Sequence, residues 1–598
     1  MIAPSALKSS RSTLGYAKFG LIKPSVGDQQ WFKRQLNTSL VDCALSLSGL
    51  KCAGVGLLST CIGDGYSLRV LQSPWSGNTY LITHAPGGLS TVRVNAKLDA
   101  KCAVRPITAY CYGLSEVGPF MVKEANVNVK VYGNQIEVVT SGEGDYCDSV
   151  IALTKDLNGL GDVLGRLPKP LPLIQGGFFE DGLIWAMVRA GYVKEGELPS
   201  FIKPNQAYYW ARGDVVNPSL AGWVEEGNPA YLDVLTMAYE ELLSLMNEHG
   251  GVKIPYITAA KARDVYGSPQ QSYIFNTLLR GFELTGDSRY LDGALKALEC
   301  YLTQPPNCLG YIDLGGGMRW FRWGSRHFLS TDPQGWENLM VLNTHLMAVL
   351  SFAEAHIRGL CGSCLSHALS GVKAIIKLAD KFQRGDGYLY YSLYSREHMG
   401  EGEDDRYPPY RGYSLLSSRL ALKASMYLGD DKLYDMAKRA CLMGYRMVEG
   451  GRWGEYEAVA RCLSLIYLRE GDADALNMII NVLKAAYGNR VWVKATGYDV
   501  EGAFKAHYQP ATITKGRVQL VYVGPMGGAL NMVAYSEGSR IVIKGYRSPS
   551  GHGVLVKGIE AVGVNGSVRV NGSEIEVNGG ALIRIDEDVV KPAVAGLR

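Results

Sequence analysis

The central half of this sequence repeats the apolar period of helices. Between residues 178 and 487, ten segments carry apolar residues three and four positions apart, which indicates helices with a buried face. Glycine can end a helix in the left-handed conformation, and a following aspartate can cap the next helix. Such a dipeptide occurs between helical segments at Gly286-Asp287, Gly429-Asp430 and Gly471-Asp472. Repeated αα-hairpins of this kind predict a solenoid or a closed (α/α) toroid.

Strand patterns flank the helical half on both sides. Residues 40–155 alternate between apolar and polar side chains, which predicts an antiparallel β domain with a hairpin turn at Gly133-Asn134. After residue 491, short alternating segments are separated by the hairpin signals Asn565-Gly566, Asn571-Gly572 and Asn578-Gly579. The proline-rich stretch at residues 166–177 predicts an extended linker. The predicted fold is therefore multidomain α+β, with an N-terminal antiparallel β domain and linker (1–170), a central (α/α) toroid (171–490) and a C-terminal β-sandwich (491–598).

The charge and hydropathy of the chain exclude several classes of partner. Its 598 residues carry a formal net charge of +4 without a run of lysine and arginine, so we expect no nucleic acid partner. No apolar run approaches the roughly 18 residues that a membrane-spanning helix needs, and the first residues lack the apolar core of a signal peptide. We therefore expect a soluble chain without a transmembrane segment, and no pattern indicates an oligomeric state.

Cysteines are concentrated near the N-terminus, where the first quarter of the chain holds six of the twelve. This enrichment is compatible with disulfides in an extracellular protein or in a protein of thermophile origin, with buried free thiols as the alternative. Cys361 and Cys364 have the spacing of a redox pair or of half a zinc site. Structural zinc needs four ligands and no second pair follows, so we predict no metal there.

Aromatic and basic residues gather between residues 320 and 345. Aromatic rings stack on sugars, and arginine and amide groups can bind a carboxylate, so this composition indicates a site for an acidic sugar. The predicted substrate-binding residues here are Arg322, Arg326, Trp323, Asn343 and His345. The alternative is that the tryptophans, Asn343 and His345 are satisfied core residues. The motifs GxxxxGK[ST], HExxH and GxSxG are absent, which disfavours nucleotide hydrolysis, zinc-dependent proteolysis and esterase chemistry.

The stretch from Gly385 to Tyr413 contains seven tyrosines between two helical segments. A long loop between packed helices is functional or disordered, and so much tyrosine favours function. A catalytic tyrosine needs its pKa of about 10 lowered, which nearby cations can do. The available arginines are Arg384, Arg396, Arg406 and Arg411. The acidic run at residues 401–405 predicts a solvated loop, with a structural Ca²⁺ site or a catalytic carboxylate as alternatives.

Residues 270–447 resemble the C-terminal α/α domain of D-glucuronyl C5-epimerases in the order and spacing of these segments. In that family a Val-Leu-Asn helix, a Tyr-Asp-Leu segment and an Asp-Tyr-His-x-x-His segment line the cleft, and tyrosines are implicated in proton exchange at C5 of uronates. The third segment lacks both histidines here, with Ser414 and Ser417 nearby, and Ser392 replaces the aspartate of the second. The matching positions are Val341-Leu342-Asn343, Tyr391-Ser392-Leu393, and Tyr413 or Tyr410.

The resemblance implies an enzyme that acts at C5 of uronic acid residues in an acidic polysaccharide. Tyr391 and Tyr413 would take and return the proton, and Arg322, Arg326 and Asn343 would hold the carboxylate. Further candidates are Tyr410 and His398 for catalysis and Arg396 and Arg411 for binding. No cofactor is expected apart from the alternative of structural Ca²⁺.

Three other functions fit the same sequence. A polysaccharide lyase would use the same residues until the enolate expels the C4 oxygen. An inverting glycoside hydrolase would need two carboxylates about 6.5–9.5 Å apart. The last alternative is a non-catalytic glycan-binding protein.

Overall fold

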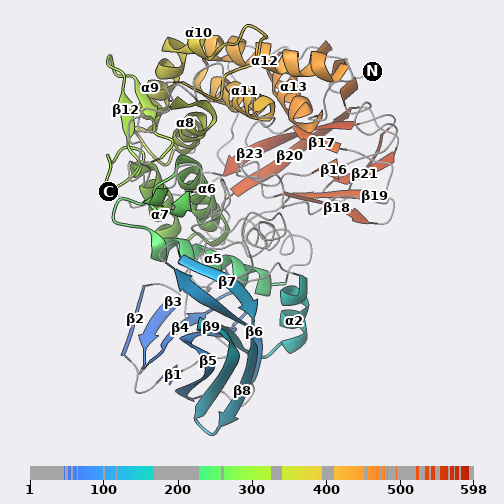
Figure 1. Ribbon diagram of the computed structural model, residues 1–598. Coiled ribbons are helices and arrows are strands. Elements are labelled where there is room, and N and C mark those ends of the chain that lie inside the picture. The colour runs from blue at the N-terminus through green and yellow to red at the C-terminus, as the bar shows by residue number, and fades with distance from the viewer. Residues whose placement is uncertain are drawn as a thin grey trace.

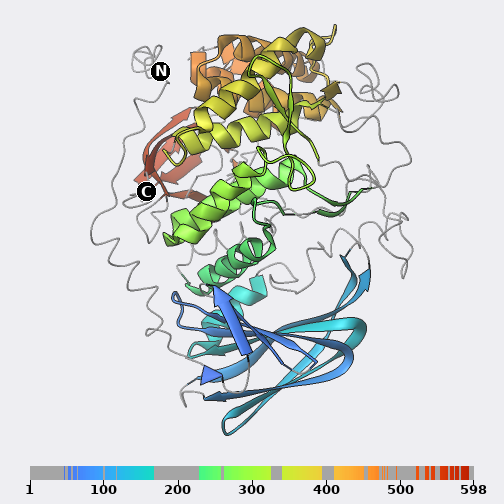
Figure 2. The same cartoon turned by 90° about the vertical axis from the view of Figure 1, so that its left-hand side faces the viewer.

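The structure is a computed structural model. It describes, with short gaps, residues 46–166, 228–324, 340–393 and 410–470, a few residues between 474 and 494, and strands between residues 520 and 590. Figure 1 shows three regions: an N-terminal sheet, a central set of helices, and C-terminal strands beside the last helices. The central helices lie between the other two regions along the sequence, and Figure 2 shows them stacked above the N-terminal strands.

The N-terminal region is an antiparallel sheet of nine strands. Its strand order is β2-β3-β4-β5-β9-β6-β7, with β1 paired to β5 and β8 paired to β9. Tyr132 pairs with Gln135 across the predicted hairpin turn, and Gly133 takes the left-handed φ of 55° that this turn needs. The antiparallel arrangement predicted for residues 40–155 is therefore confirmed. The strands are β1 (Ser46–Leu47), β2 (Lys51–Val55), β3 (Leu58–Ile62), β4 (Ser67–Gln72), β5 (Thr79–Lys97), β6 (Ala103–Ser115), β7 (Gly118–Glu124), β8 (Asn126–Tyr132) and β9 (Gln135–Thr154).

Both faces of this sheet are covered near its centre. Side chains such as Leu81 and Ile151 form one apolar cluster, whereas Tyr80 and Val150 point to the opposite face. That second face packs against α2 (Leu157–Arg166) and α5 (Ala230–Leu245). Because successive side chains of a strand alternate between faces, two-sided burial explains the nearly continuous burial of residues 79–85.

A buried carboxylate joins the sheet to α5. Asp233 accepts hydrogen bonds from Tyr80 Oη at 2.6 Å and Asn78 Nδ2 at 3.3 Å. The hydroxyls of Ser73 and Ser76 donate to the same carboxylate. Burial raises the pKa of Asp233, while these four donors favour its charged form. The turn between β4 and β5 is thereby held on the helix.

The central helices form αα-hairpins, as the periodicity predicts. Gly286 ends α6 at a φ of 73°, and Asp287 caps α7 by accepting from the Arg289 N–H at 3.0 Å. Gly429 has a φ of 72°, and Asp430 Oδ1 accepts from the Leu433 N–H at 2.8 Å. The third predicted turn, at residues 471–472, lies outside the described residues. The helices are α6 (Ser268–Thr285), α7 (Ser288–Glu299), α8 (Leu342–Ile357), α9 (Cys364–Lys377), α10 (Ala379–Phe382), α11 (Tyr410–Leu428), α12 (Asp431–Glu449) and α13 (Tyr456–Glu470).

These helices are arranged in two layers. In the inner layer α6 packs on α8, α8 on α11 and α11 on α13, while α7, α9 and α12 each pack on the inner helix that precedes them. The layers differ in burial: every residue from Met340 to Ala355 is buried, whereas α7 buries only one face. A helix that is apolar all round belongs inside a core, and an amphipathic helix belongs at its surface.

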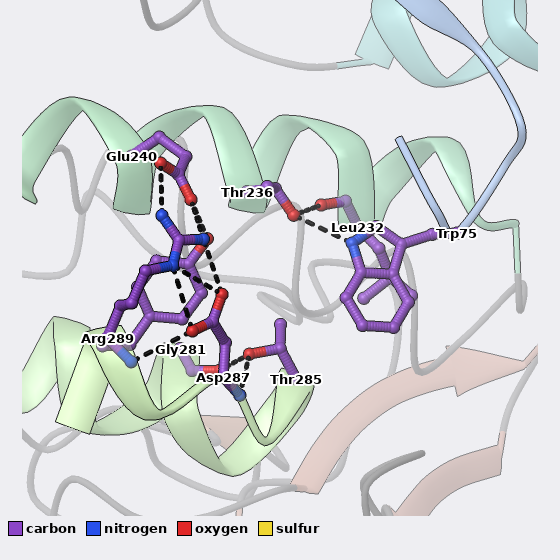
Figure 3. A network of polar contacts seen from close by, with 9 residues as sticks. Trp75, Leu232, Thr236, Glu240, Gly281, Thr285, Asp287 and Arg289 are labelled. Carbon is purple, nitrogen blue, oxygen red and sulfur yellow. Dashed lines mark hydrogen bonds and ion pairs between the residues drawn. The ribbon is translucent and has the colours of Figure 1, made fainter. Parts of the chain in front are cut away.

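A second buried network joins α5 to α7 (Figure 3). The Arg289 guanidinium donates to both carboxylate oxygens of Glu240, at 2.7 and 3.1 Å, and to Asp287 at 2.6 Å. Tyr290 Oη donates to Glu240 at 2.8 Å. Thr236, which is also on α5, accepts a hydrogen bond at 3.0 Å from Nε1 of Trp75 in the turn between β4 and β5. Helix α5 is thus fastened on one side to the sheet and on the other to the first helical hairpin.

The short central strands were not predicted from the sequence. They are β10 (Ile254–Ile257), β11 (Ala262–Val265), β12 (Tyr311–Asp313), β13 (Arg319–Phe321), β14 (Met340–Val341) and β15 (Ser392–Leu393). Met340 and Val341 belong to β14, although the helical period of residues 337–356 extends through them. A strand of two residues is set by its distant partner and not by local periodicity.

The C-terminal strands form two sheets of four, in the orders β16-β17-β23-β20 and β18-β19-β21-β22. Val570 pairs with Ser573, so β21 and β22 form an antiparallel hairpin where the sequence predicts one, and Asn571-Gly572 between them lies outside the described residues. The other two Asn-Gly dipeptides instead join strands of different sheets, so their prediction as hairpins is wrong. The strands are β16 (Val493–Lys494), β17 (Leu520–Val523), β18 (Met532–Glu537), β19 (Arg540–Gly545), β20 (Gly553–Val562), β21 (Gly566–Val570), β22 (Ser573–Val577) and β23 (Ala581–Val590).

Disulfides occur in both the sheet and the helical region. Four are fully described: Cys111–Cys147, Cys300–Cys308, Cys361–Cys364 and Cys441–Cys462. Cys61 and Cys102 are also disulfide-bonded. Bonded cysteines are compatible with an extracellular location. Among the described helices, none has the length and apolar character to cross a membrane.

Candidate active site

The N-termini of α6 and α8 meet at one end of the helical layer. Ser268, the first residue of α6, donates its N–H to the Trp323 carbonyl oxygen at 2.9 Å and its hydroxyl to the Thr344 carbonyl oxygen at 3.1 Å. It therefore connects the end of β13 with the first turn of α8. Helix N-termini carry free N–H groups and a partial positive charge, which suits a site for a carboxylate.

The Val-Leu-Asn and Tyr-Ser-Leu segments lie side by side. Val341 pairs with Ser392 in the antiparallel β14–β15 ladder, and the Leu342 N–H donates to the Tyr391 carbonyl oxygen at 3.0 Å. The two segments are about fifty residues apart in the sequence, yet this ladder fixes their register. Tyr391 is consequently held beside the start of α8, where Asn343 lies.

Tyr391 and Tyr413 face one another. Their ring centroids are 4.9 Å apart with the planes tilted by 52°, and both side chains are partly exposed. The Leu389 N–H donates to Ser414 Oγ at 2.8 Å, which joins the segment before Tyr391 to the N-terminal part of α11. Burial raises the pKa of Tyr413 above its ordinary value of 10.0. The neutral phenol is therefore the favoured form of Tyr413 near neutral pH.

Asn343 is a buried amide with an unused acceptor. Its side chain is 6% exposed, and Oδ1 has no hydrogen-bond partner in the part of the chain that the structure describes. An unsatisfied buried polar atom costs free energy, about 1–3 kcal/mol, and calls for an explanation such as a missing ligand. The carboxamide lies one residue after Leu342, which contacts the Tyr391 main chain.

His345 and Trp320 occupy the core, which agrees with the core alternative for both residues. The His345 ring is fully buried; its Nδ1 accepts from the Phe321 N–H at 2.9 Å, and its Nε2 lies 3.1 Å from the Gly371 carbonyl oxygen. Trp320 stacks on this ring at 4.0 Å. Burial lowers the pKa of His345 to about 4. Both ring nitrogens are engaged by main chain, so His345 supports β13 and α9 and has no free nitrogen for a substrate.

Arg384, one of the four arginines expected to act on the tyrosines, is bonded to an aspartate. Arg384 donates to Asp386 at 2.9 Å, and its guanidinium lies 5.4 Å from the ring centre of Tyr390. The sequence-based expectation was a lowered tyrosine pKa, whereas the described residues raise the pKa of Tyr413. Burial explains that direction.

Arg322 and Trp323 are partly exposed at the end of β13. The Arg322 N–H donates to the Gly310 carbonyl oxygen at 3.2 Å. Trp323 is connected to the start of α8 through Ser268, as described above. Both residues therefore belong to the same end of the helical layer as Asn343.

Several predicted site residues cannot be placed. Tyr410 and Arg411 are in the first turn of α11, but their side chains are not described. The residues outside the described part of the chain are Arg326, Arg396, His398, Arg406 and the acidic run at residues 401–405. Within the described residues, no group of three acidic, histidine or cysteine side chains could hold a metal ion.

Sequence reasoning missed the two serines that assemble this end of the helical layer. Ser268 and Ser414 both lie near the start of an inner helix, and each bonds a segment that comes from another part of the chain. Their position near a helix start is the only sequence signal, and it is shared by many serines that only cap their own helix.

Residues 261–407 match the family model described as D-glucuronyl C5-epimerase C-terminus. The match includes Asn343 and Tyr391 and ends shortly before Tyr413. The match supports a sugar-modifying activity for this chain, and the resemblance inferred from the sequence is confirmed.

Several solved structures are similar to part of the chain. D-mannose isomerase has 9% identity and a TM-score of 0.35, covering 52% of this chain and 87% of its own. Unsaturated glucuronyl hydrolase from Bacillus sp. GL1 has 13% identity and a TM-score of 0.32, covering 46% and 74%. Cellobiose 2-epimerase from Bacillus thermoamylovorans has 12% identity and a TM-score of 0.31, covering 47% and 76%. A search among curated proteins finds no match.

Proposed function

We propose that this protein epimerises uronic acid residues in an acidic polysaccharide by exchanging the proton at C5. The observation that carries the proposal is the contact between Tyr391 and Tyr413, at 4.9 Å, within and beside the segment that matches the C5-epimerase family. At this ring spacing no sugar ring fits between the two phenols. A uronate lying across their hydroxyl ends could meet one phenol on each face of C5. An inversion at C5 needs a base on one face and an acid on the other.

We assign the two tyrosines different roles. Burial raises the pKa of Tyr413, so this residue starts as a neutral phenol and can donate a proton. Tyr391 acts as its phenolate: it takes the C5 proton, becomes a neutral phenol and leaves an enolate of the uronate carboxylate. Tyr413 gives its proton to the opposite face of C5 and becomes the phenolate, and a later proton transfer from Tyr391 to Tyr413 restores the starting pair.

Charge that develops on the carboxylate must be stabilised by groups already in place. The N-termini of α6 and α8 lie side by side, and Arg322 follows β13 at the same end of the helical layer. We propose that the uronate carboxylate binds at this end. The Asn343 carboxamide can donate to the carboxylate, and its Oδ1 can accept from a sugar hydroxyl. Substrate binding would thereby satisfy the Asn343 oxygen, which has no donor among the residues that the structure describes. Arg326, Arg396, Arg411, Tyr410 and His398 remain further candidates of this site.

We propose that the described helices and strands belong to three domains. We expect the two helical layers to close into an (α/α) toroid over residues 171–490, with the tyrosine pair at one rim. The two C-terminal sheets would pack as a β-sandwich over residues 491–598, after an N-terminal β domain with linker at residues 1–170. An extracellular location would suit both the disulfides and a polysaccharide substrate.

One assay tests the reaction. The protein is incubated in deuterated water with a glucuronate- or iduronate-containing polysaccharide, and the product is examined by NMR and by mass spectrometry. Deuterium at C5 in chains of unchanged length supports the epimerase. An ultraviolet band of an unsaturated uronate would make the protein a lyase, in which the same enolate expels the C4 oxygen. New reducing ends without either signal would indicate a hydrolase, and no change on any acidic glycan would overturn the enzymatic proposal in favour of a glycan-binding role.

A further inference from the structure

The disulfide between Cys361 and Cys364 lies at the start of an outer helix. Cys364 is the first residue of α9, Ser363 occupies the N-cap position, and Cys361 precedes both. The bridge spans a sequence separation of 3, whereas Cys111–Cys147 spans 36. Cross-links stabilise a fold mainly by restricting the unfolded chain, and they do so less for shorter loops. Stabilisation is therefore a weak reason for this bridge.

One of its two cysteines, Cys361, is more exposed than every other cysteine of the fully described disulfides. The Cys361 side chain is partly exposed, and the neighbouring residues Gly362 and Ser363 are exposed. Cys364 is 1% exposed. The remaining six cysteines are 0–1% exposed: Cys111, Cys147, Cys300, Cys308, Cys441 and Cys462. A dissolved thiol can approach Cys361, but it cannot approach the other three bridges without opening the fold.

The helix favours negative charge on the sulfur that would be released. Cys364 begins a helix of 14 residues, and the Ser363 side chain does not cap it. A thiolate at a helix N-terminus is stabilised by the helix dipole and by free N–H groups. One turn further along, His367 Nδ1 lies 3.0 Å from the Arg319 guanidinium, which places a fixed cation near the same end of α9. A stabilised thiolate is a better leaving group in disulfide exchange.

We infer that Cys361–Cys364 is a thiol–disulfide exchange site that a dithiol reductant can open while Cys111–Cys147, Cys300–Cys308 and Cys441–Cys462 stay closed. A thiolate of the dithiol attacks Cys361 Sγ, and the bond to Cys364 breaks with its electron pair leaving on Cys364. The second thiol of the reductant, as a thiolate, then attacks the mixed disulfide and expels the Cys361 thiolate. The reductant is oxidised to its own disulfide, and the two protons lost by its thiols go to the two cysteines. This inference does not depend on the proposed sugar chemistry.

A redox titration of the full chain tests the site. The protein is equilibrated in buffers with increasing ratios of reduced to oxidised dithiothreitol, alkylated, and mapped by peptide mass spectrometry. We expect Cys361 and Cys364 to become half-alkylated at a ratio at least tenfold lower than Cys300 and Cys308, with unchanged circular dichroism. Simultaneous reduction of both bridges, or later reduction of Cys361–Cys364, would overturn the inference.

Two matched variants test the direction of attack. Cys364→Ser leaves the Cys361 thiol alone, and Cys361→Ser leaves the Cys364 thiol alone. Oxidised glutathione should form a mixed disulfide with Cys361 at least tenfold faster than with Cys364, because only Cys361 is accessible. Equal rates, or a faster reaction of Cys364, would contradict the proposed exchange. The titration of the unmodified chain remains decisive if either variant fails to fold.

Discussion

The ring of Tyr391 lies 4.9 Å from the ring of Tyr413, although one residue precedes β15 and the other belongs to α11. Two contacts between separate segments create this relationship. The β14–β15 ladder holds the main chain next to Tyr391, and Ser414 Oγ accepts a hydrogen bond from the Leu389 N–H. The pair is thus positioned by main-chain bonds from both sides. Replacing one hydroxyl should leave the geometry intact.

Removing either hydroxyl should abolish proton exchange without unfolding the protein. We expect Tyr391→Phe and Tyr413→Phe each to lower the rate of deuterium incorporation by at least about 100-fold, the usual contribution of a positioned acid or base. Tyr390→Phe is the matched control, since Tyr390 lies beside Arg384, and it should retain activity within about twofold. Thermal unfolding should be nearly unchanged in all three variants. Full activity in both Tyr391→Phe and Tyr413→Phe would exclude these tyrosines from the reaction.

The sequence predicted the helices well because helical periodicity is local. It predicted the caps at Gly286-Asp287 and Gly429-Asp430 for the same reason. It failed at Met340 and Val341, whose strand depends on a partner about fifty residues away. Asn565-Gly566 has the local signature of a hairpin, yet it joins strands of two different sheets. Non-local pairing overrides the turn signal there.

The candidate site was predictable in part. The Val-Leu-Asn and Tyr-Ser-Leu segments were recognised by their family motifs, and the structure brings them together. The environments of single side chains were not predictable: His345 and Asn343 lie two residues apart on one apolar helix, but only Asn343 keeps an unused acceptor. Whether a buried polar residue is satisfied depends on main-chain groups from β13 and α9, which no local pattern specifies.

Burial of His345 makes part of the stability depend on pH. Its pKa is lowered from 6.5 to about 4 in the fold, so between these values the unfolded chain binds a proton that the folded chain does not. The contribution of neutral His345 to the free energy of unfolding is fully present above pH 6.5 and is lost as the pH falls toward 4. At 1.36 kcal/mol per unit, the difference is about 3 kcal/mol.

Urea unfolding at several values between pH 7 and pH 4 measures this contribution. His345→Gln should have a lower free energy of unfolding than the unmodified chain at pH 7. Between pH 7 and pH 4 its free energy of unfolding should fall by about 3 kcal/mol less than that of the unmodified chain. His356→Gln, at the end of the same helix, is the control and should keep the slope of the unmodified chain. Identical slopes for the unmodified chain and His345→Gln would contradict the assignment.

The left-handed helix ends should tolerate no side chain without strain. Gly429 has a φ of 72°, and a Cβ built there would meet no atom within 4 Å, so only backbone strain opposes a substitution. Gly429→Ala should lower the free energy of unfolding by about 1 kcal/mol. Gly385 also has an open position for a Cβ but lies outside the left-handed region, so Gly385→Ala should change stability by less than about 0.5 kcal/mol. Denaturant unfolding of the two variants separates strain from crowding, and equal effects would rule out strain as the cause.

The ion network between α5 and α7 should behave as one unit. Glu240 is 4% exposed, burial raises its pKa, and Arg289 opposes that rise by favouring the charged carboxylate. Arg289→Met removes the cation but leaves two buried carboxylates, which should cost about 3–5 kcal/mol.

A double-mutant cycle measures the coupling. Glu240→Gln in the Arg289→Met background removes the uncompensated charge, so the double variant should be more stable than the sum of the single effects predicts, by about 1–3 kcal/mol. The free energies of unfolding of the four proteins in urea give this coupling energy directly. Additive effects would contradict this expectation. They would mean that Glu240 and Arg289 stabilise the fold independently and that the two hydrogen bonds between these residues, at 2.7 and 3.1 Å, add no coupling energy.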